Sequence, residues 1–325
     1  MFTEALEDIL RDRCTPAVVR AIEAGGDPTP LWKAVADAGF LELLSAEQDG
    51  GAELPLEELF PIVAALGRHA VPLPVAQSIA ARALLPAGQA PAGLVTLAPA
   101  GRRTMGGWQC PQVPYGTIAT HVLADDGTDL LLFDTARAER LVAGVHRSQS
   151  ATLRFGDADG PQRYPRQPEA QEAFGAALHA ALIAGAMGRA FDMALQYGND
   201  RVQFGRAIGK FQAVQHQLAV MAEQVAASRI AAEAAFRTGG TAPRRLAAAI
   251  AKARTSEAVT QVAEIAHAVH GAIGVTQEYD LQLLTKRLHE WRIAHGSEAH
   301  WHRMVGEAFI LKPLPFVDFI RAAAA

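Results

Sequence analysis

The C-terminal half of the chain carries apolar side chains at alternating steps of three and four residues. The stripe runs through Phe211, Val214, Leu218, Met221 and Val225, and after Thr241-Ala242-Pro243 it resumes with Leu246, Ile250, Val262, Ile265 and Val269. This spacing gathers the apolar residues on one face of each helix, and the alanines between them allow close helix packing. We therefore expect residues 168–325 to form a bundle of four long antiparallel helices.

Two regions of different character precede this bundle. Residues 1–88 predict helices joined by short turns, with apolar stretches at 31–44 and 56–67 and a break at Asp49-Gly50-Gly51. Residues 89–167 contain two short β-branched runs, 118–124 and 129–134, separated by the hairpin signal Asp126-Gly127. The sequence predicts a mainly α protein with an N-terminal helical domain, a reduced β domain and a C-terminal four-helix bundle.

The overall composition excludes several classes of protein. The formal charge is −4 over 325 residues, with Lys and Arg spread along the chain, which argues against nucleic acid as a partner. Cys14 and Cys110 match no zinc or redox spacing, so we expect reduced thiols. The acidic start argues against a targeting signal, and no uncharged apolar run approaches the ~20 residues of a membrane span. We expect a cytoplasmic protein with no membrane span.

The segment from Arg201 to Gln212, RVQFGRAIGKFQ, lies between two predicted helices. Arg201 and Arg206 can pair with a diphosphate, because a guanidinium binds phosphate oxygens in a bidentate way. Phe204 can lie against an adenine or flavin ring, and Gln212 offers an amide to a polar ligand edge. From the residues alone, this pattern indicates an anionic ligand that can also carry an aromatic ring. An ordinary helix–turn–helix with solvated arginines is the alternative.

A second segment, His270-Gly271-Ala272-Ile273-Gly274-Val275-Thr276-Gln277-Glu278-Tyr279, follows a long predicted helix. Glycine at a helix end permits positive φ and lets a ligand approach backbone N–H groups. A glycine stop is also what most helices need, so the pattern alone is weak.

These two segments, together with residues 31–51, resemble the acyl-CoA dehydrogenase family. The resemblance implies FAD as the cofactor, bound mainly by a neighbouring subunit. It implies that Arg201, Phe204 and Gln212 contact that FAD, and that Gly271 and Gly274 lie in the loop that receives its diphosphate. It also implies an acyl-CoA substrate, electron-transferring flavoprotein as acceptor, a role in fatty acid or steroid side-chain catabolism, and a homo-oligomer or a heteromer with a full-length homologue.

The chain departs from the family pattern at three places. Ala268 and Ala272 stand where the family has a Gln and a second Gly. The β domain is short, and it lacks the TEPxxGSD-like segment that supplies hydroxyls and backbone groups to the flavin ring. A flavin bound within this β domain would therefore need different residues.

The catalytic base also departs from the family. Oxidation at the α,β bond needs a base for the α proton while the flavin accepts the β hydride. The family's base is a Glu in a YEGTSE-like string, and alignment on the glycine puts His295 at that position; alignment on Arg303 puts Gly296 there. The family's other base position holds His179. A lone histidine on an alanine-rich helix, such as His179, is more often a core or interface residue. His295 is the catalytic candidate, because an imidazole can also serve as a base.

A cluster of histidines near the C-terminus raises the question of a metal. His289, His295, His300 and His302 lie among Glu290 and Glu298, but they lack the HExxH order. We expect a solvated helix face and no metal there.

Three functions remain open from the sequence. The first is a flavoprotein subunit that dehydrogenates an acyl-CoA thioester with FAD. The alternative is a non-catalytic subunit of a heteromeric acyl-CoA dehydrogenase, which completes a partner's FAD site. A helical protein without flavin is the third. The missing Glu and the missing TEP segment favour the second, and predict little activity from the isolated chain.

Overall fold

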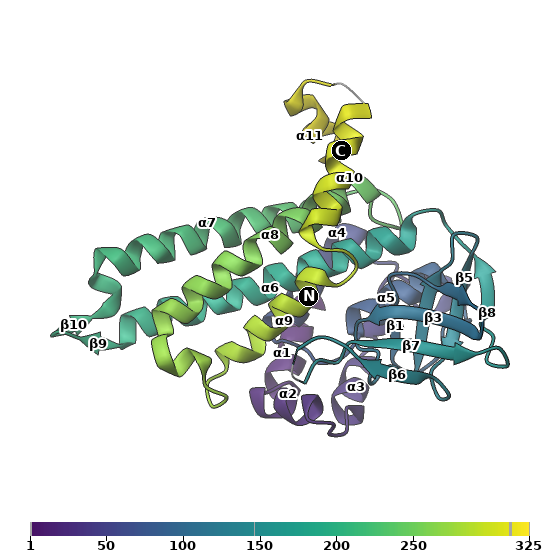
Figure 1. Ribbon diagram of the computed structural model, residues 1–325, viewed down its shortest axis with the longest axis horizontal. Coiled ribbons are helices and arrows are strands. Elements are labelled where there is room, and N and C mark those ends of the chain that lie inside the picture. The colour runs from purple at the N-terminus through teal and green to yellow at the C-terminus, as the bar shows by residue number, and fades with distance from the viewer. Residues whose placement is uncertain (1, 146, 312–313, 325) are drawn as a thin grey trace.

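The computed structural model describes residues 2–145, 147–311 and 314–324, and its helices and strands follow one another as three regions (Figure 1). The N-terminal region contains α1 (Phe2–Arg13), α2 (Pro16–Glu23), α3 (Thr29–Ala36), η1 (Phe40–Glu42), η2 (Glu47–Asp49), α4 (Leu56–Arg68) and α5 (Val75–Leu84). Local capping explains where α2 begins. The Thr15 hydroxyl accepts a hydrogen bond from the Val18 N–H, and Pro16 occupies the first helical position.

The middle region is a pair of four-stranded sheets. The strands are β1 (Val95–Leu97), β2 (Arg102–Thr104), β3 (Gly107–Val113), β4 (His121–Asp125), β5 (Asp129–Asp134), β6 (Glu139–Val142), β7 (Ala151–Gly156) and β8 (Gln162–Pro165). One sheet has the order β1-β4-β5-β8 and the other β2-β3-β7-β6, and among the described strands only β1 and β4 pair in parallel. The predicted hairpin is confirmed, because β4 and β5 are antiparallel around Asp126-Gly127, with Gly127 at φ 94°.

The C-terminal region is a bundle of long helices. Its elements are α6 (Ala170–Asp200), β9 (Val202–Gln203), β10 (Arg206–Ala207), η3 (Ile208–Lys210), α7 (Gln212–Ala234), α8 (Arg245–His270), η4 (Gly271–Val275), α9 (Leu281–Ile293), α10 (Glu298–Leu311) and α11 (Phe316–Ala324). The predicted mainly α fold with a small β region is confirmed. Of the predicted stripe on α7, Leu218 and Met221 are buried, and much of the helix remains exposed.

Helix α6 forms the centre of the molecule. It is long and apolar enough to cross a membrane, but 78% of its most apolar window is buried inside the protein, so it is a core helix. Close packing against α4 depends on glycine. A Cβ at Gly185 would lie 1.9 Å from the carbonyl oxygen of Ala64, so a side chain there would force the two helices apart.

A buried ionic cluster joins the three regions. Arg287 of α9 lies 3.2 Å from Glu23 of α2 and 3.2 Å from Glu290, and it donates to the Gln149 side chain of the β region at 2.8 Å. Burial disfavours the charged guanidinium, but the neighbouring carboxylates outweigh this and raise the pKa of Arg287. Removing Arg287 would leave the buried carboxylates of Glu23 and Glu290 without this guanidinium, so the cluster fixes α9 against both neighbours.

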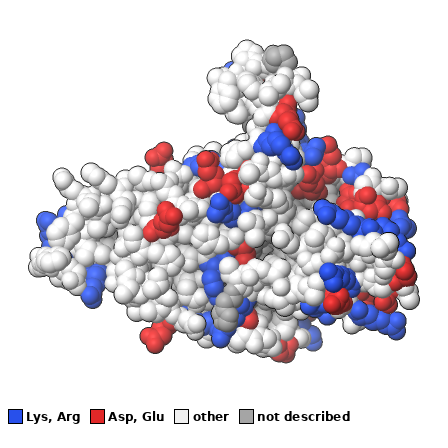
Figure 2. Space-filling model, in the orientation of Figure 1, with Lys and Arg blue, Asp and Glu red and all other residues white. Residues whose placement is uncertain are grey.

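The surface differs between the two ends of the molecule (Figure 2). Basic and acidic side chains are interspersed over the β region, whereas the visible face of the bundle carries few charges. The α10–α11 hairpin projects from the body. On the side shown, the basic side chains do not gather into a single face.

Candidate functional site

The two glycine-containing segments meet at one end of the bundle, where β9–β10 and η4 lie next to each other (Figure 1). They enclose an open depression of about 910 Å³, which we call the distal site. It is lined by Tyr197, Asp200, Arg201, Gln203, Ile208, Ala268, Val269, His270, Gly271, Ala272, Ile273 and Thr276.

The β9–β10 hairpin presents Arg201 and Phe204. Arg201 terminates α6 by donating its N–H to the Tyr197 carbonyl, and its side chain is exposed. The Gln203 amide lies 2.8 Å from Nη2 of Arg201 and accepts a hydrogen bond when its oxygen faces the guanidinium. Phe204 is 91% exposed at φ 51°, a left-handed backbone that is rare for an aromatic residue. An aromatic ring held out in water at such a strained position is typical of a contact site.

The second wall of the distal site is the end of α8. Gly271 has φ 64°, and its open side faces no other atom within 4 Å. Gly274 is buried, and a Cβ there would lie 2.8 Å from the Cβ of His270. The His270 ring packs between Tyr197 and Tyr279, at centroid distances of 4.6 and 5.0 Å. Its Nε2 atom is buried without a hydrogen-bond partner in the described structure.

The structure thus brings some predicted residues together and separates others. Arg201 and Gly271 both line the distal site, whereas Phe204, Gln212 and Gly274 lie beside it. Gln212 is the first residue of α7 and is exposed. An unshielded guanidinium, a glycine backbone open to solvent and an exposed aromatic ring are suited to a diphosphate with a flat ring system. Their roles toward a cofactor remain predictions.

A second depression, of about 430 Å³, lies where the β region meets α6 and α10. We call it the junction pocket. It is lined by Ala98, Pro99, Asp125, Arg166, Glu169, Gln171, Glu172, Arg245, His295, Gly296 and His300. Gln171 joins the sheet to α6, because its amide donates to the carbonyl oxygen of Ala98 at 2.8 Å.

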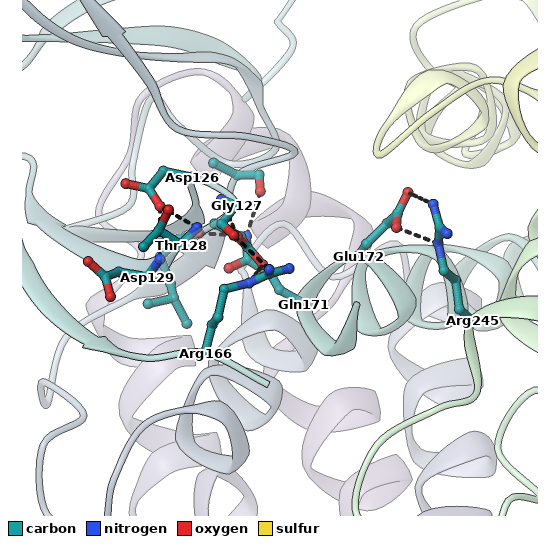
Figure 3. Close-up of polar contacts among 11 residues, drawn as sticks. Asp126, Gly127, Thr128, Asp129, Arg166, Gln171, Glu172 and Arg245 are labelled. Carbon is teal, nitrogen blue, oxygen red and sulfur yellow. Dashed lines mark hydrogen bonds and ion pairs between the residues drawn. The ribbon is translucent and has the colours of Figure 1, made fainter. Parts of the chain in front are cut away.

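The charged side chains around the junction pocket form ion pairs with one another, among them the pair of Glu172 and Arg245 (Figure 3). Arg166 donates to Asp125 at 2.9 Å and to the Gly127 carbonyl at 2.8 Å. Arg245 donates to Glu172 at 2.7 Å and to Glu169 at 3.1 Å. Each carboxylate lining the pocket is therefore paired with a guanidinium. The guanidinium donors thus occupy oxygen atoms of these carboxylates.

His295 lies at the inner end of this pocket and is buried, with 7% of its surface exposed. Its Nε2 atom lies 3.1 Å from the carbonyl oxygen of Leu97, so Nε2 carries the proton and donates it. Its Nδ1 atom faces Gly175 so closely that a Cβ there would lie 2.2 Å away. Burial lowers the pKa of His295 to about 4. The ring is therefore neutral at pH 7, and both of its nitrogens are turned into the protein.

Two further buried residues, His179 and Lys252, lie behind His295. His179 is fully buried, and its ring centroid is 5.0 Å from that of His295. Burial holds the pKa of His179 well below its usual value. The Lys252 ammonium donates to the Ser256 hydroxyl at 2.8 Å and to the carbonyl oxygens of Arg292 and Gly296 at 2.8 and 3.0 Å.

Lys252 stabilises the loop that carries His295 and Gly296. His295 has φ 53° and Gly296 has φ 101°, so two consecutive residues are left-handed. Burial lowers the pKa of Lys252 to about 7, but the three acceptors around the ammonium favour its charged form, and we take the lysine as protonated. Sequence reasoning missed Lys252, because a single lysine within an alanine-rich helix is usually solvated.

The histidine cluster near the C-terminus does not converge. His300 faces Glu172 at 3.9 Å and His302 faces Glu257 at 3.8 Å, while His295 points inward. Within the described residues, no group of three potential ligands lies close enough to hold a metal ion.

Comparison with known proteins shows the family to which this chain is related. Residues 1–90 match the model of the acyl-CoA dehydrogenase N-terminal domain, and residues 170–310 match that of the C-terminal domain. The chain is 33% identical over 310 residues to acyl-CoA dehydrogenase IpdE2 of Mycolicibacterium smegmatis, covering 91% of this chain and 92% of that protein. It also resembles IpdE2 of Mycobacterium tuberculosis, with 32% identity over 91% of each chain. Its fold is similar to a chain of the ChsE4-ChsE5 complex from Mycobacterium tuberculosis, with a TM-score of 0.84, 21% identity, and coverage of 96% of this chain and 97% of that chain.

Proposed function

Because this chain belongs to the acyl-CoA dehydrogenase family, we propose that it is the non-catalytic subunit of a heteromeric acyl-CoA dehydrogenase. In this proposal a full-length partner binds FAD and supplies the base, and the distal site of this chain completes the partner's cofactor site. Bound FAD would accept the β hydride of an acyl-CoA.

One observation carries the proposal: within the described residues, every carboxylate that lines the junction pocket is paired with an arginine, and the histidine at the aligned base position is buried. His295 stands at the aligned base position, yet it is neutral, buried and hydrogen-bonded to Leu97. A histidine that accepted the α proton would become a cation in this enclosed environment, whereas a glutamate would become neutral. Asp125, Glu169 and Glu172 are held in ion pairs with arginines.

The distal site supports the other half of the proposal. Arg201 is exposed, and its guanidinium can bind a diphosphate through two N–H groups. At Gly271 no side chain blocks access to the backbone. Exposed apolar side chains surround them, namely Val202 at 59%, Phe204 at 91% and Val275 at 70% exposure. A subunit that covered this end of the bundle would bury these side chains. A flavin bound between the two chains would be enclosed by both.

The choice of a partner in this proposal is supported by solved complexes of similar chains. Related chains occur in solved complexes, including ChsE4-ChsE5 and a steroid acyl-CoA dehydrogenase of Tcur3481 and Tcur3483, to which this chain is 25% identical with a TM-score of 0.80. We propose a full-length homologue that retains the glutamate, an acyl-CoA substrate and electron-transferring flavoprotein as acceptor. A steroid-derived acyl group and a cytoplasmic location belong to this proposal.

Substitution of Arg201 tests the cofactor role. In the co-expressed complex, Arg201→Ala should lower the affinity for FAD about tenfold to a hundredfold, because it removes a charge-assisted contact. Arg201→Lys should recover only part of the loss, since an ammonium lacks the bidentate fork. Arg237→Ala is the control, because Arg237 pairs with Glu233. Unchanged FAD affinity in Arg201→Ala would make Arg201 a solvated surface residue.

A further inference from the structure

A third concave site lies apart from the distal site and the junction pocket and shares no lining residue with either. It is a pocket of about 470 Å³ enclosed by α1, α2, α4, α6 and α9, where the N-terminal helices meet the bundle (Figure 1). Its size falls within the range of small-molecule sites. We propose that it binds a small amphiphilic carboxylate, that is, an apolar chain or ring carrying a single carboxylate group.

The floor of this pocket is apolar. It is formed by Leu10, Cys14, Val19, Ala70, Leu283 and Leu284, each no more than 4% exposed. Burial raises the pKa of the Cys14 thiol to about 12, so Cys14 is a neutral, weakly polar group there. Ala70 holds φ 48°, a left-handed backbone maintained in a buried alanine beside the cavity. An apolar body would be favoured on this floor because it releases water from both surfaces.

The rim of the pocket is charged, and most of its charges are paired. Arg68 lies 2.8 Å from Asp192, Arg11 lies 2.9 Å from Asp8, and Asp280 lies 2.7 Å from Arg20. These pairs leave little capacity for a ligand. They do, however, fix the rim in place around the apolar floor.

Arg189 is the exception on this rim. It projects from α6 and is exposed, and among the described residues it has neither a hydrogen bond nor an ion pair. A free guanidinium beside an apolar cavity is suited to a carboxylate, which it binds through two parallel hydrogen bonds. The ligand would therefore place its apolar body on the floor and its carboxylate at Arg189.

His69 and Glu7 complete the rim. Burial lowers the pKa of His69; Glu7 opposes this shift, and Arg68, Arg189 and Arg11 reinforce it. Arg68 and Arg11 are paired with Asp192 and Asp8, so among the described residues Arg189 is the cation beside His69 that is left to attract a negative ligand group. Glu7 lies 3.9 Å from the His69 ring and would oppose a carboxylate. Its neutralisation should therefore strengthen binding.

Two probes of the same shape test the proposal, namely cyclohexanecarboxylate and its neutral amide. Ligand-observed NMR titration of the full chain should give a dissociation constant about tenfold lower for the carboxylate. Arg189→Gln should remove this preference, and Glu7→Gln should increase it. Arg303→Gln, an exposed arginine of α10, is the matched control. Met193→Trp should block both probes by filling the cavity that Met193 lines.

Several outcomes would overturn the proposal. Equal affinity for the two probes in the unsubstituted chain would show that no guanidinium recognises the carboxylate. Binding of the carboxylate that survives Arg189→Gln unchanged, or binding that persists in a folded Met193→Trp variant, would place the probe elsewhere. Absence of binding of either probe would leave the pocket without this ligand class.

Discussion

The imidazole of His295 lies directly against the backbone of Gly175, so closely that a Cβ on Gly175 would come within 2.2 Å of Nδ1. Helix α6 and the loop before α10 are therefore fitted to each other at a position that admits no side chain on the helix. This contact, together with the hydrogen bond to Leu97, turns both nitrogens of His295 into the protein. It is the structural reason for treating His295 as a packed residue and not as a base.

Gly175→Ala should destabilise the protein by about 1–3 kcal/mol, because the added methyl group forces the imidazole or its loop to move. Gly188→Ala is the matched control in the same helix, since a Cβ there meets no atom within 4 Å. That control should stabilise the protein by about 0.4–1 kcal/mol, because alanine lowers the conformational entropy of the unfolded chain relative to glycine. Urea denaturation measures both changes.

A second substitution separates this contact from a general effect of alanine. In Gly175→Ala combined with His295→Ala, the methyl group has room, so the double variant should be more stable than the sum of the single changes predicts. Strict additivity would contradict the contact.

The stability of the protein should depend on pH through His295. Its pKa is about 4 in the folded chain, below its ordinary value of 6.5, so the unfolded chain binds more protons between these values. Stability is therefore fully present above pH 6.5 and is lost as the pH falls toward 4. For this group alone the loss between pH 7 and pH 5 is about 2 kcal/mol.

Comparison with His295→Gln isolates this contribution from the other groups that titrate. Free energies of unfolding at pH 7, 6 and 5 should fall less steeply in the variant. Parallel curves for the two proteins would mean that His295 is protonated equally in the folded and unfolded states.

The catalytic contribution of His295 can be measured in the assembled complex. His295→Ala should leave the acyl-CoA dehydrogenase turnover of the complex nearly intact, because the proposed base belongs to the partner. A positioned general base is worth about 10²–10⁴ in rate, so loss of that size would identify His295 as the base. Measuring kcat and FAD content on the same preparations distinguishes lost chemistry from lost assembly.

The sequence predicted the elements whose signals are local. The step of three and four residues predicted α7 and α8, and Asp126-Gly127 predicted the β4–β5 hairpin. Both depend on neighbours within a few positions, which a single sequence displays. The glycine loop and Arg201 were likewise recognisable as a local pattern.

The environment of His295 could not be predicted in the same way. Its hydrogen-bond acceptor, Leu97, is 198 residues away in the chain, and its packing partner Gly175 lies in another helix. The Lys252 ammonium likewise donates to the carbonyl oxygens of Arg292 and Gly296, which only the tertiary fold brings close to it. The sequence singled out His295 by alignment, and the tertiary structure determined its burial and protonation.

The most direct test of the account is the flavin content of the chain alone and with a full-length homologue. Purified alone, this chain should be colourless, because its β domain lacks the segment that supplies hydroxyls and backbone groups to the flavin ring in the family. Co-expressed with the homologue, it should purify as a yellow heteromer with one FAD for each pair of chains. A yellow homomer of this chain, with one FAD per subunit and acyl-CoA dehydrogenase activity that His295→Ala abolishes, would contradict the account.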